Sequence, residues 1–427
     1  MLETRLLVAL LILPLLQACA YSIVQGDHVR ADAFDDVLTR TATARGLPVP
    51  EQYETKVIKR NAIPELLRGA ILADWSTQEI ADYQDALVAI GAWPADRDLV
   101  EEYIAVSREE LAGLYVPADA TLYVLKDAPT PFSVKLISAM TGRDLILEFI
   151  LAHELIHLLQ HGAYPALLED DPSWRDQDDA AYALHAAIEG DATRYGLVAV
   201  VGGPYGLPSA EEFRTDMETE ERGDDGALAR APALLRLTLA FPYAWGYGLS
   251  LSEGPALLDE PPASTEQVLH PEKRREPFLA IDLAPAHSAL PVGCRWLGDN
   301  TMGELGISVL LRDLGEAPAA AAWEGWDGDR YLAARCDDRR AFLWETHWDS
   351  DDDATEFATS YAGIAARVGQ RAGLDQPLQI RRNGRRVRIV TEPLLTLADS
   401  LDTHSHRRRV TTLPQLRRHF GVEVRER

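Results

Sequence analysis

The spacing of hydrophobic positions changes along the chain, and it is helical in the first part. Between residues 27 and 106 the apolar positions recur at the three- and four-residue spacing of amphipathic helices. The pattern breaks at the run 46–50, which contains glycine and prolines, and again at Trp93-Pro94. This pattern predicts a helical N-terminal subdomain over residues 19–110.

A hairpin and two largely apolar helices are expected next. Residues 113–116 and 121–125 have the composition of strands and flank the turn-forming run 117–120, which predicts a strand hairpin. The following helix is expected over residues 143–161. Because it is apolar almost all round, it should be buried. A second helix is expected over residues 177–200.

The rest of the sequence predicts helices up to about residue 311 and then a mixture of strands and helix. A helix is expected at 354–368, and Asn383-Gly384 favours a tight hairpin turn between two of the strands. Strands are expected at 331–335, 341–348, 378–382 and 385–390. The chain as a whole is therefore expected to be α+β, with a mainly helical core over 111–311 and a C-terminal α+β module over 312–427.

Chemistry is concentrated in the buried helix, where residues 153–157 are His-Glu-Leu-Ile-His. Histidines four residues apart project from one face of a helix, so the imidazoles of His153 and His157 can reach one metal ion. Catalytic zinc takes three protein ligands and lowers the pKa of a bound water from about 16 to about 7. Glu154 is placed to accept a proton from that water as it attacks a peptide carbonyl. The motif predicts one zinc ion per chain and a third ligand elsewhere.

The third ligand distinguishes the families that share this motif. A metzincin would need glycine and histidine at the positions of Gln160 and Ala163. A gluzincin instead needs a glutamate on a following helix, and Glu189 lies on such a helix in the run Glu-Gly-Asp-Ala. Residues 112–193 therefore resemble the thermolysin-like gluzincins. The resemblance is closer to envelope lipoproteins that combine a Gly-x-Tyr hairpin, an Ala-His-Glu-Leu-x-His helix and a Glu-Gly-Asp-Ala helix.

The resemblance implies a zincin-like fold and a peptidase with Glu189 as the third zinc ligand. An extended substrate would lie along the hairpin, which assigns substrate binding to Tyr115, Leu122 and Tyr123. A histidine or tyrosine would donate a hydrogen bond to the developing oxyanion. The candidates for this donor are His270, Tyr243 and Tyr247, of which His270 is preferred.

One position departs from the family pattern. Four residues after the glutamate ligand the family has an aspartate that orients a metal-binding histidine, and this chain has Thr193. Either Thr193 takes that role or the orienting group comes from elsewhere, since Asp191 is expected on the opposite helix face. His185, four residues before Glu189, could neighbour the site, although a structural role is preferred for it. We interpret His161 as an exposed or capping histidine.

The N-terminus predicts export and a lipid anchor. The apolar run 6–16 is too short to span a bilayer. It ends in Leu16-Gln17-Ala18-Cys19, which resembles the bacterial lipobox and implies a signal peptide over residues 1–18 and a lipidated Cys19. Ala20 after the cysteine would favour the outer membrane, with the protein facing the periplasm or the cell surface. An ordinary cleaved signal peptide is the alternative.

Two further cysteines, Cys294 and Cys336, complete the chain's cysteine content. Export would place them in a compartment where disulfides persist. The spacing leaves open both a disulfide and two separate buried thiols.

The charge of the chain narrows the range of partners. A formal net charge of -25 argues against binding nucleic acid, which needs a basic surface. Arginines gather near residues 381–388 and 407–409; they are interpreted first as solvated faces and second as a patch for an anionic surface. The partners expected are a peptide or protein substrate and, through the lipid, a membrane.

Two other functions compete with the peptidase. One is a lipoprotein scaffold with a structural or vestigial zinc site, and the other is a hydrolase of peptidoglycan amide bonds. Glu154 favours an enzyme, because a structural zinc site has no need of a general base between its ligands.

Overall fold

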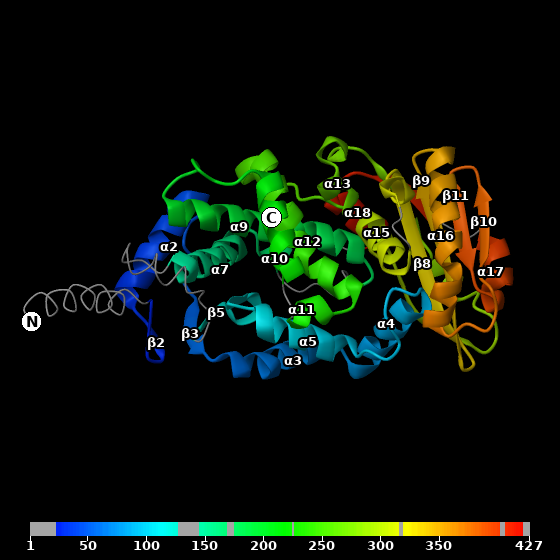
Figure 1. Ribbon diagram of the computed structural model, residues 1–427, viewed down its shortest axis with the longest axis horizontal. Helices are drawn as coiled ribbons and strands as arrows, with labels where there is room; N and C mark the ends of the chain where they lie inside the picture. The colour runs from blue at the N-terminus through cyan, green and yellow to red at the C-terminus, as the bar shows by residue number, and fades with distance from the viewer. Residues whose placement is uncertain are drawn as a thin grey trace, which may run out of the picture.

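The molecule has two halves along its long axis (Figure 1). The computed structural model describes residues 23–126, 145–168, 175–223, 226–315, 319–401 and 406–421. A mostly helical half, which contains the N-terminal region, lies beside a half built on a five-stranded sheet. The α+β class predicted from the sequence is confirmed.

The helical half holds most of the elements before residue 270. Its strands are β1 (Val24–Gln25), β2 (His28–Val29), β3 (Glu54–Ile58), β4 (Gly113–Val116) and β5 (Thr121–Leu125). Its helices are α2 (Ala31–Arg45), α3 (Ile63–Asp74), α5 (Leu99–Glu110), α7 (Leu145–Ala163), α8 (Pro165–Leu168), α9 (Asp178–Val201), α10 (Ala210–Gly223), α11 (Ala227–Arg230), α12 (Ala233–Glu253) and α13 (Glu266–Leu269).

The second half takes one helix from the N-terminal region, α4 (Thr77–Ala89), and the rest from the C-terminal part. Its strands are β6 (Phe278–Asp282), β7 (Cys294–Asn300), β8 (Trp326–Cys336), β9 (Arg339–Trp348), β10 (Gln379–Asn383), β11 (Arg386–Val390) and β12 (His406–Val410). Its remaining helices are α14 (Ala284–His287), α15 (Gly303–Leu314), α16 (Asp351–Ala372), α17 (Leu395–Ser400) and α18 (Leu413–His419).

A three-stranded sheet with the order β3-β5-β4 lies under the helical half. The predicted hairpin is confirmed as the antiparallel pair β4 and β5. β3 pairs with β5 in parallel, from Glu54 opposite Thr121 to Ile58 opposite Leu125, after a crossover through α3 to α5. β5 is therefore the central strand, and β4 is an edge strand.

The residues expected to form an N-terminal subdomain up to residue 110 pack closely against the rest of the chain. β3 completes the sheet next to β5, and α2 packs against both α7 and α9. α4 leaves this half and packs against β7, β8 and β9. Amphipathic helices do not show in sequence which neighbour their apolar faces will cover, so the helical pattern alone could not assign these partners.

The five-stranded sheet has the order β10-β11-β9-β8-β7 with antiparallel neighbours, and both of its faces are covered. Ala333 and Trp344 point to the side of α4, α15 and α16, whereas Leu332 and Leu343 belong to a second core with α14 and α17. Burial on both faces explains the continuously apolar runs 331–334 of β8 and 341–344 of β9. The expected boundary at 312 falls inside α15, whose side chains belong to this core.

Cys294 and Cys336 form a disulfide that joins β7 to β8, where the two residues lie directly opposite each other. The structure therefore selects the paired alternative. Within the described ranges no helix is long and apolar enough to cross a membrane. Cys19 and the expected signal peptide lie outside these ranges.

The C-terminal arginines are largely engaged in ion pairs. Arg388 and Arg407 both contact the buried carboxylate of Glu345, and Arg409 contacts Asp327. Arg381 contacts Asp399. These four cations are therefore paired within the protein.

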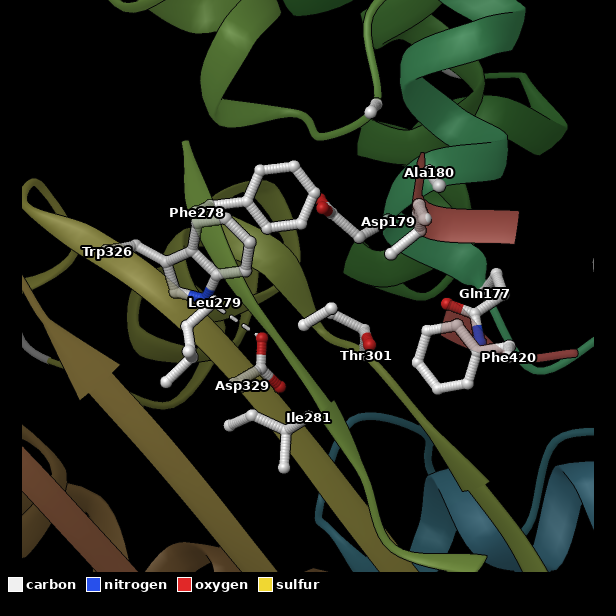
Figure 2. Close-up of a pocket in the computed structure, with 13 residues that line it drawn as sticks. Gln177, Asp179, Ala180, Phe278, Leu279, Ile281, Thr301, Trp326, Asp329 and Phe420 are labelled. Carbon is white, nitrogen blue, oxygen red and sulfur yellow. Dashed lines mark hydrogen bonds between the residues drawn. The ribbon is translucent and has the colours of Figure 1, made fainter. Parts of the chain in front are cut away.

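A small cavity lies where the two halves meet (Figure 2). Its walls come from the start of α9 (Gln177, Asp179), from β6 and β8, and from Phe420 after α18. The indole N–H of Trp326 donates to Asp329 Oδ1 at 2.9 Å beside it. The cavity has a volume of about 10 Å³, which is room for about one water molecule, so it is not a substrate site.

Candidate metal centre

The His-Glu-Leu-Ile-His motif lies in the middle of α7, between the three-stranded sheet and α9 (Figure 1). The helix spans Leu145–Ala163, close to the expected 143–161. Leu151, Leu155 and Leu158 fill the core toward α2 and β5. The histidines lie on the face turned toward α9, and this face holds the side chains that could bind a metal.

His153, His157 and Glu189 are brought together as the sequence predicts. Among the described residues, these three offer ligand atoms that all lie within 4.8 Å of one another. The Nε2 of His153 lies 3.0 Å from Glu189 Oε2 and 3.2 Å from the Nε2 of His157. Two imidazole nitrogens and one carboxylate oxygen converging on one point are the donor set of a catalytic zinc site, so the residues fit this metal.

Glu154 faces the edge strand of the sheet. The backbone N–H of Tyr115 donates to Glu154 Oε2 at 2.8 Å. A Cβ atom on Gly113 would lie 2.8 Å from Glu154 Cγ, so glycine is needed for β4 to pass this close. The tyrosine hydroxyl is 2.8 Å from His161 Nδ1, so His161 anchors β4 rather than serving as the expected exposed or capping histidine. The potential base and the edge strand are therefore in direct contact.

Tyr243 reaches the cluster because α9 and α12 cross at two glycines. A Cβ atom on Gly190 would lie 2.0 Å from the carbonyl oxygen of Gly246, and one on Gly246 would lie 2.0 Å from that of Ala186. This crossing places the Tyr243 ring over His153, with ring centroids 6.0 Å apart. Burial raises the pKa of the Tyr243 hydroxyl well above its usual value, and the charges of Glu189 and Glu154 add to this. The hydroxyl therefore lies beside both carboxylates.

The other oxyanion candidates lie elsewhere. His270 follows α13, which Figure 1 shows well separated from α7 along the molecule, and its Nε2 is 2.8 Å from Glu304 Oε1. Tyr247 donates its hydroxyl to the carbonyl oxygen of Pro208 at 2.8 Å. The preference for His270 is therefore not supported. The sequence could not favour Tyr243, because spacing along the chain does not reveal the glycine crossing of α9 and α12.

Two of the expected substrate-binding residues belong to the central strand. Leu122 is fully buried in the core between α2 and α7. Tyr123 pairs with Lys56 of β3, and its hydroxyl donates to Asp119 at 3.3 Å. Because β3 pairs with one side of β5 and β4 with the other, β5 offers no edge to an added strand, and β4 is the outer strand that lies against Glu154. This corrects the assignment of Leu122 and Tyr123 and leaves Tyr115.

The charges of the cluster favour a protonated His157 next to an ionised Glu189. Burial disfavours the charged imidazolium of His157, but the carboxylate of Glu189 overcomes this and raises the pKa of His157 to about 9. Burial opposes ionisation of Glu189 too, yet the positive charge of His157 and hydrogen bonds from the histidines hold its pKa well below the usual range. Burial raises the pKa of Glu154. A metal ion entering the site would displace the proton on His157.

His185 neighbours the cluster, which is the alternative that its four-residue spacing from Glu189 had left open. Its Nε2 lies 3.1 Å from Glu189 Oε1, so this histidine contacts the second carboxylate oxygen. Sequence reasoning missed Gln160. Gln160, three residues after His157, contacts that histidine, and Thr193 does not, since its buried hydroxyl has no partner. Of the two alternatives for orientation, the structure supports a group other than Thr193.

Comparison with known proteins covers only the C-terminal part. Residues 293–402 match a family described as Domain of unknown function (DUF8575). That range contains the five-stranded sheet and begins after the helices that carry His153, His157 and Glu189. No curated protein and no solved structure matches the chain significantly.

Proposed function

We propose that this protein hydrolyses peptide bonds as a zinc-dependent peptidase. The observation that carries the proposal is the joint placement of His153, His157 and Glu189 within 4.8 Å of one another, with Glu154 between the histidines and against an edge strand. A purely structural zinc site would not require that buried carboxylate. The order of the β4–β5 hairpin, α7 and α9 also agrees with the gluzincin resemblance of the sequence.

His153, His157 and Glu189 would hold the zinc ion. When bound, zinc supplies Lewis-acid chemistry, since it makes a water molecule acidic enough to lose a proton near pH 7. Glu154 accepts that proton and can return it to the leaving amine nitrogen, and its burial, which raises its pKa, favours such an exchange. Tyr243 is placed to donate its hydroxyl hydrogen to the developing oxyanion.

The edge of β4 is where an extended substrate would add as a further strand. Tyr115 lies on this strand, and its amide is already in contact with Glu154. A peptide paired with β4 would therefore have its backbone next to the base and the ligands. This placement predicts a preference for extended peptides and leaves their sequence open.

We further propose that the protein is anchored in the bacterial envelope through a lipid on Cys19. The support is the sequence alone, namely an apolar run that ends in Leu16-Gln17-Ala18-Cys19. The disulfide between Cys294 and Cys336 agrees with an oxidising compartment. Mass spectrometry of the protein isolated from membranes tests this, since an acylated N-terminal Cys19 peptide is expected, and an unmodified N-terminus at Ala20 would contradict it.

The proposed reaction is tested with the soluble form that begins at residue 20, incubated with a complex mixture of peptides. We expect new termini by mass spectrometry, loss of cleavage with a chelator and recovery with stoichiometric zinc. Zinc binding without any cleavage would instead favour a scaffold. Cleavage of peptidoglycan cross-links in place of linear peptides would favour the amide hydrolase.

A further inference from the structure

A buried glutamine contacts the second histidine of the metal cluster. Gln160 Oε1 lies 2.9 Å from His157 Nδ1, and the glutamine side chain is fully buried. Gln160 follows His157 by three residues, so both project from adjacent turns of α7. The contact is on the ring nitrogen that faces away from His153 and Glu189, since His157 Nε2 is the atom near both of them.

The amide of Gln160 is held in one orientation. Its Nε2 donates to the carbonyl oxygen of Ile188 at 3.0 Å and to Asp191 Oδ2 at 2.9 Å. Both partners are acceptors, so the amide nitrogen must face them and the amide oxygen must face His157. An oxygen at this place accepts a hydrogen from Nδ1. The neutral imidazole therefore keeps its hydrogen on Nδ1 and leaves Nε2 free for a metal.

The acid that holds Gln160 is itself held by a buried arginine from α2. Arg45 Nε donates to Asp191 Oδ2 at 2.7 Å, and Arg45 also donates to the carbonyl oxygen of Pro255 at 3.2 Å. Both side chains of the ion pair are almost fully buried. The pairing offsets the cost of burying either charge alone. The contacts form one path, from Arg45 to Asp191, to Gln160 and to His157.

We propose that Gln160 is a positioning residue that fixes the tautomer and ring orientation of His157, with Asp191 and Arg45 holding Gln160 in place. The inference rests on the proposed metal centre. Groups that orient a metal-binding histidine typically change metal affinity by 10- to 100-fold when removed. Gln160, with Asp191 and Arg45 behind it, therefore orients the histidine in place of Thr193. Thr193 is unsuited to this role, because its buried hydroxyl has no hydrogen-bond partner.

The test compares two buried glutamines. Gln160→Met keeps the length of the side chain but removes its hydrogen bonds, and Gln267→Met does the same elsewhere. Gln267 is also fully buried, accepts from the amide of Ala263 at 2.8 Å and donates to the carbonyl oxygen of Thr411 at 2.9 Å. Zinc affinity is measured by competition with a chromophoric chelator, and the visible spectrum of the cobalt-substituted protein reports ligand geometry.

We expect Gln160→Met to bind zinc about 10- to 100-fold more weakly than the wild type and to shift the cobalt bands. Gln267→Met should leave both unchanged, although it also loses buried hydrogen bonds. If Gln160→Met does not fold, Gln160→Asn, whose shorter side chain cannot span His157 and Asp191 together, is expected to weaken zinc binding in the same direction.

Each outcome separates the inference from the proposed function. Wild-type affinity and spectrum in folded Gln160→Met, or in folded Gln160→Asn, would overturn the positioning role while leaving the peptidase proposal intact. An equal loss of affinity in Gln267→Met would overturn it too, because a general loss of stability would then explain the effect. Wild-type protein that binds zinc without hydrolysing peptides would refute the peptidase alone, and protein that binds no zinc would refute both.

Discussion

The carboxylate of Glu189 favours a protonated His157 in the metal-free protein, and this has a measurable consequence for metal binding. The neighbouring carboxylate raises the pKa of His157 to about 9 against the effect of burial. Only the neutral imidazole can bind a metal, so the proton must leave when zinc enters. Glu189 is already ionised, since its pKa is held well below the usual range.

We therefore predict that zinc binding near pH 7.5 releases about one proton from His157. The apparent affinity should rise close to tenfold per pH unit between pH 7 and 8.5 and level off above pH 9, because the competing proton is then absent. Calorimetric titrations in buffers with different ionisation enthalpies measure the proton count. An affinity independent of pH over this interval would show that the histidine is neutral before the metal binds.

Tyr243 and Tyr247 lie one turn apart on α12 and differ in what their hydroxyls contact. The first lies beside Glu189 and Glu154, and the second donates to Pro208. We predict that Tyr243→Phe lowers kcat for peptide hydrolysis by about 10²- to 10³-fold, since one donor to the oxyanion is lost. Zinc content should be unchanged. Tyr247→Phe is the matched control, and an equal loss of kcat in both variants would remove Tyr243 from the reaction.

How far the sequence predicts the site differs from residue to residue. His153, His157 and Glu189 could be identified, because ligand spacing on helices follows from helix geometry. The contacts that hold Gln160 to α9, and the choice of Tyr243 over His270, depend on how separate helices meet. That information lies in packing contacts, such as the glycine crossing of α9 and α12, rather than in any local pattern.

At the scale of elements, the crossing of α9 and α12 controls the distance between a ligand and a potential donor. Gly190→Ala would place its Cβ atom 2.0 Å from the carbonyl oxygen of Gly246, so the helices must separate. We predict a loss of about 1–3 kcal/mol or more in the free energy of unfolding, together with weaker zinc binding. Urea unfolding and a zinc titration measure the two effects.

The control for this substitution lies on α16. A Cβ atom on Gly363 would meet nothing within 4 Å, and the residue is exposed in the middle of the helix. Gly363→Ala should therefore stabilise the protein by about 0.5–1 kcal/mol and leave zinc binding unchanged. Equal behaviour of the two variants would show that the crossing at Gly190 is not tight.

Local elements are the part of the fold that the sequence predicts well. The expected ends of α7 and α9 differ from the observed ends by one or two residues, and the hairpin of β4 and β5 has the expected bounds. The parallel pairing of β3 with β5 could not be predicted, because the two strands are separated by three helices and a hairpin strand. For the same reason the substrate assignment of Leu122 and Tyr123 was wrong.

At the scale of the whole molecule, one core joins the two halves. The largest hydrophobic cluster includes Ala187 of α9, Phe241 of α12, Trp344 of β9 and Phe357 of α16. The start of α9 is also tied to the sheet, since the backbone N–H of Asp178 donates to Asn300 at 2.9 Å. The helix that carries Glu189 therefore packs against both halves.

We predict that zinc stabilises the entire chain as one cooperative unit. With free zinc about 100-fold above Kd, the stabilisation should be about 2.7 kcal/mol. Thermal unfolding followed by the fluorescence of the buried tryptophans of the sheet, such as Trp326 and Trp344, should shift together with unfolding followed by circular dichroism of the helices. Two separate transitions, with only one sensitive to zinc, would show that the halves unfold independently.

The most direct test of the account is the rate of peptide cleavage by the wild type and by Glu154→Gln, each loaded with one zinc ion per chain. Glutamine keeps the shape of the side chain but cannot accept the proton, so kcat should fall by about 10²- to 10⁴-fold at equal zinc content. Equal rates in the two proteins would contradict the role of Glu154. Equal zinc content with no cleavage by either protein would contradict the assignment as a peptidase.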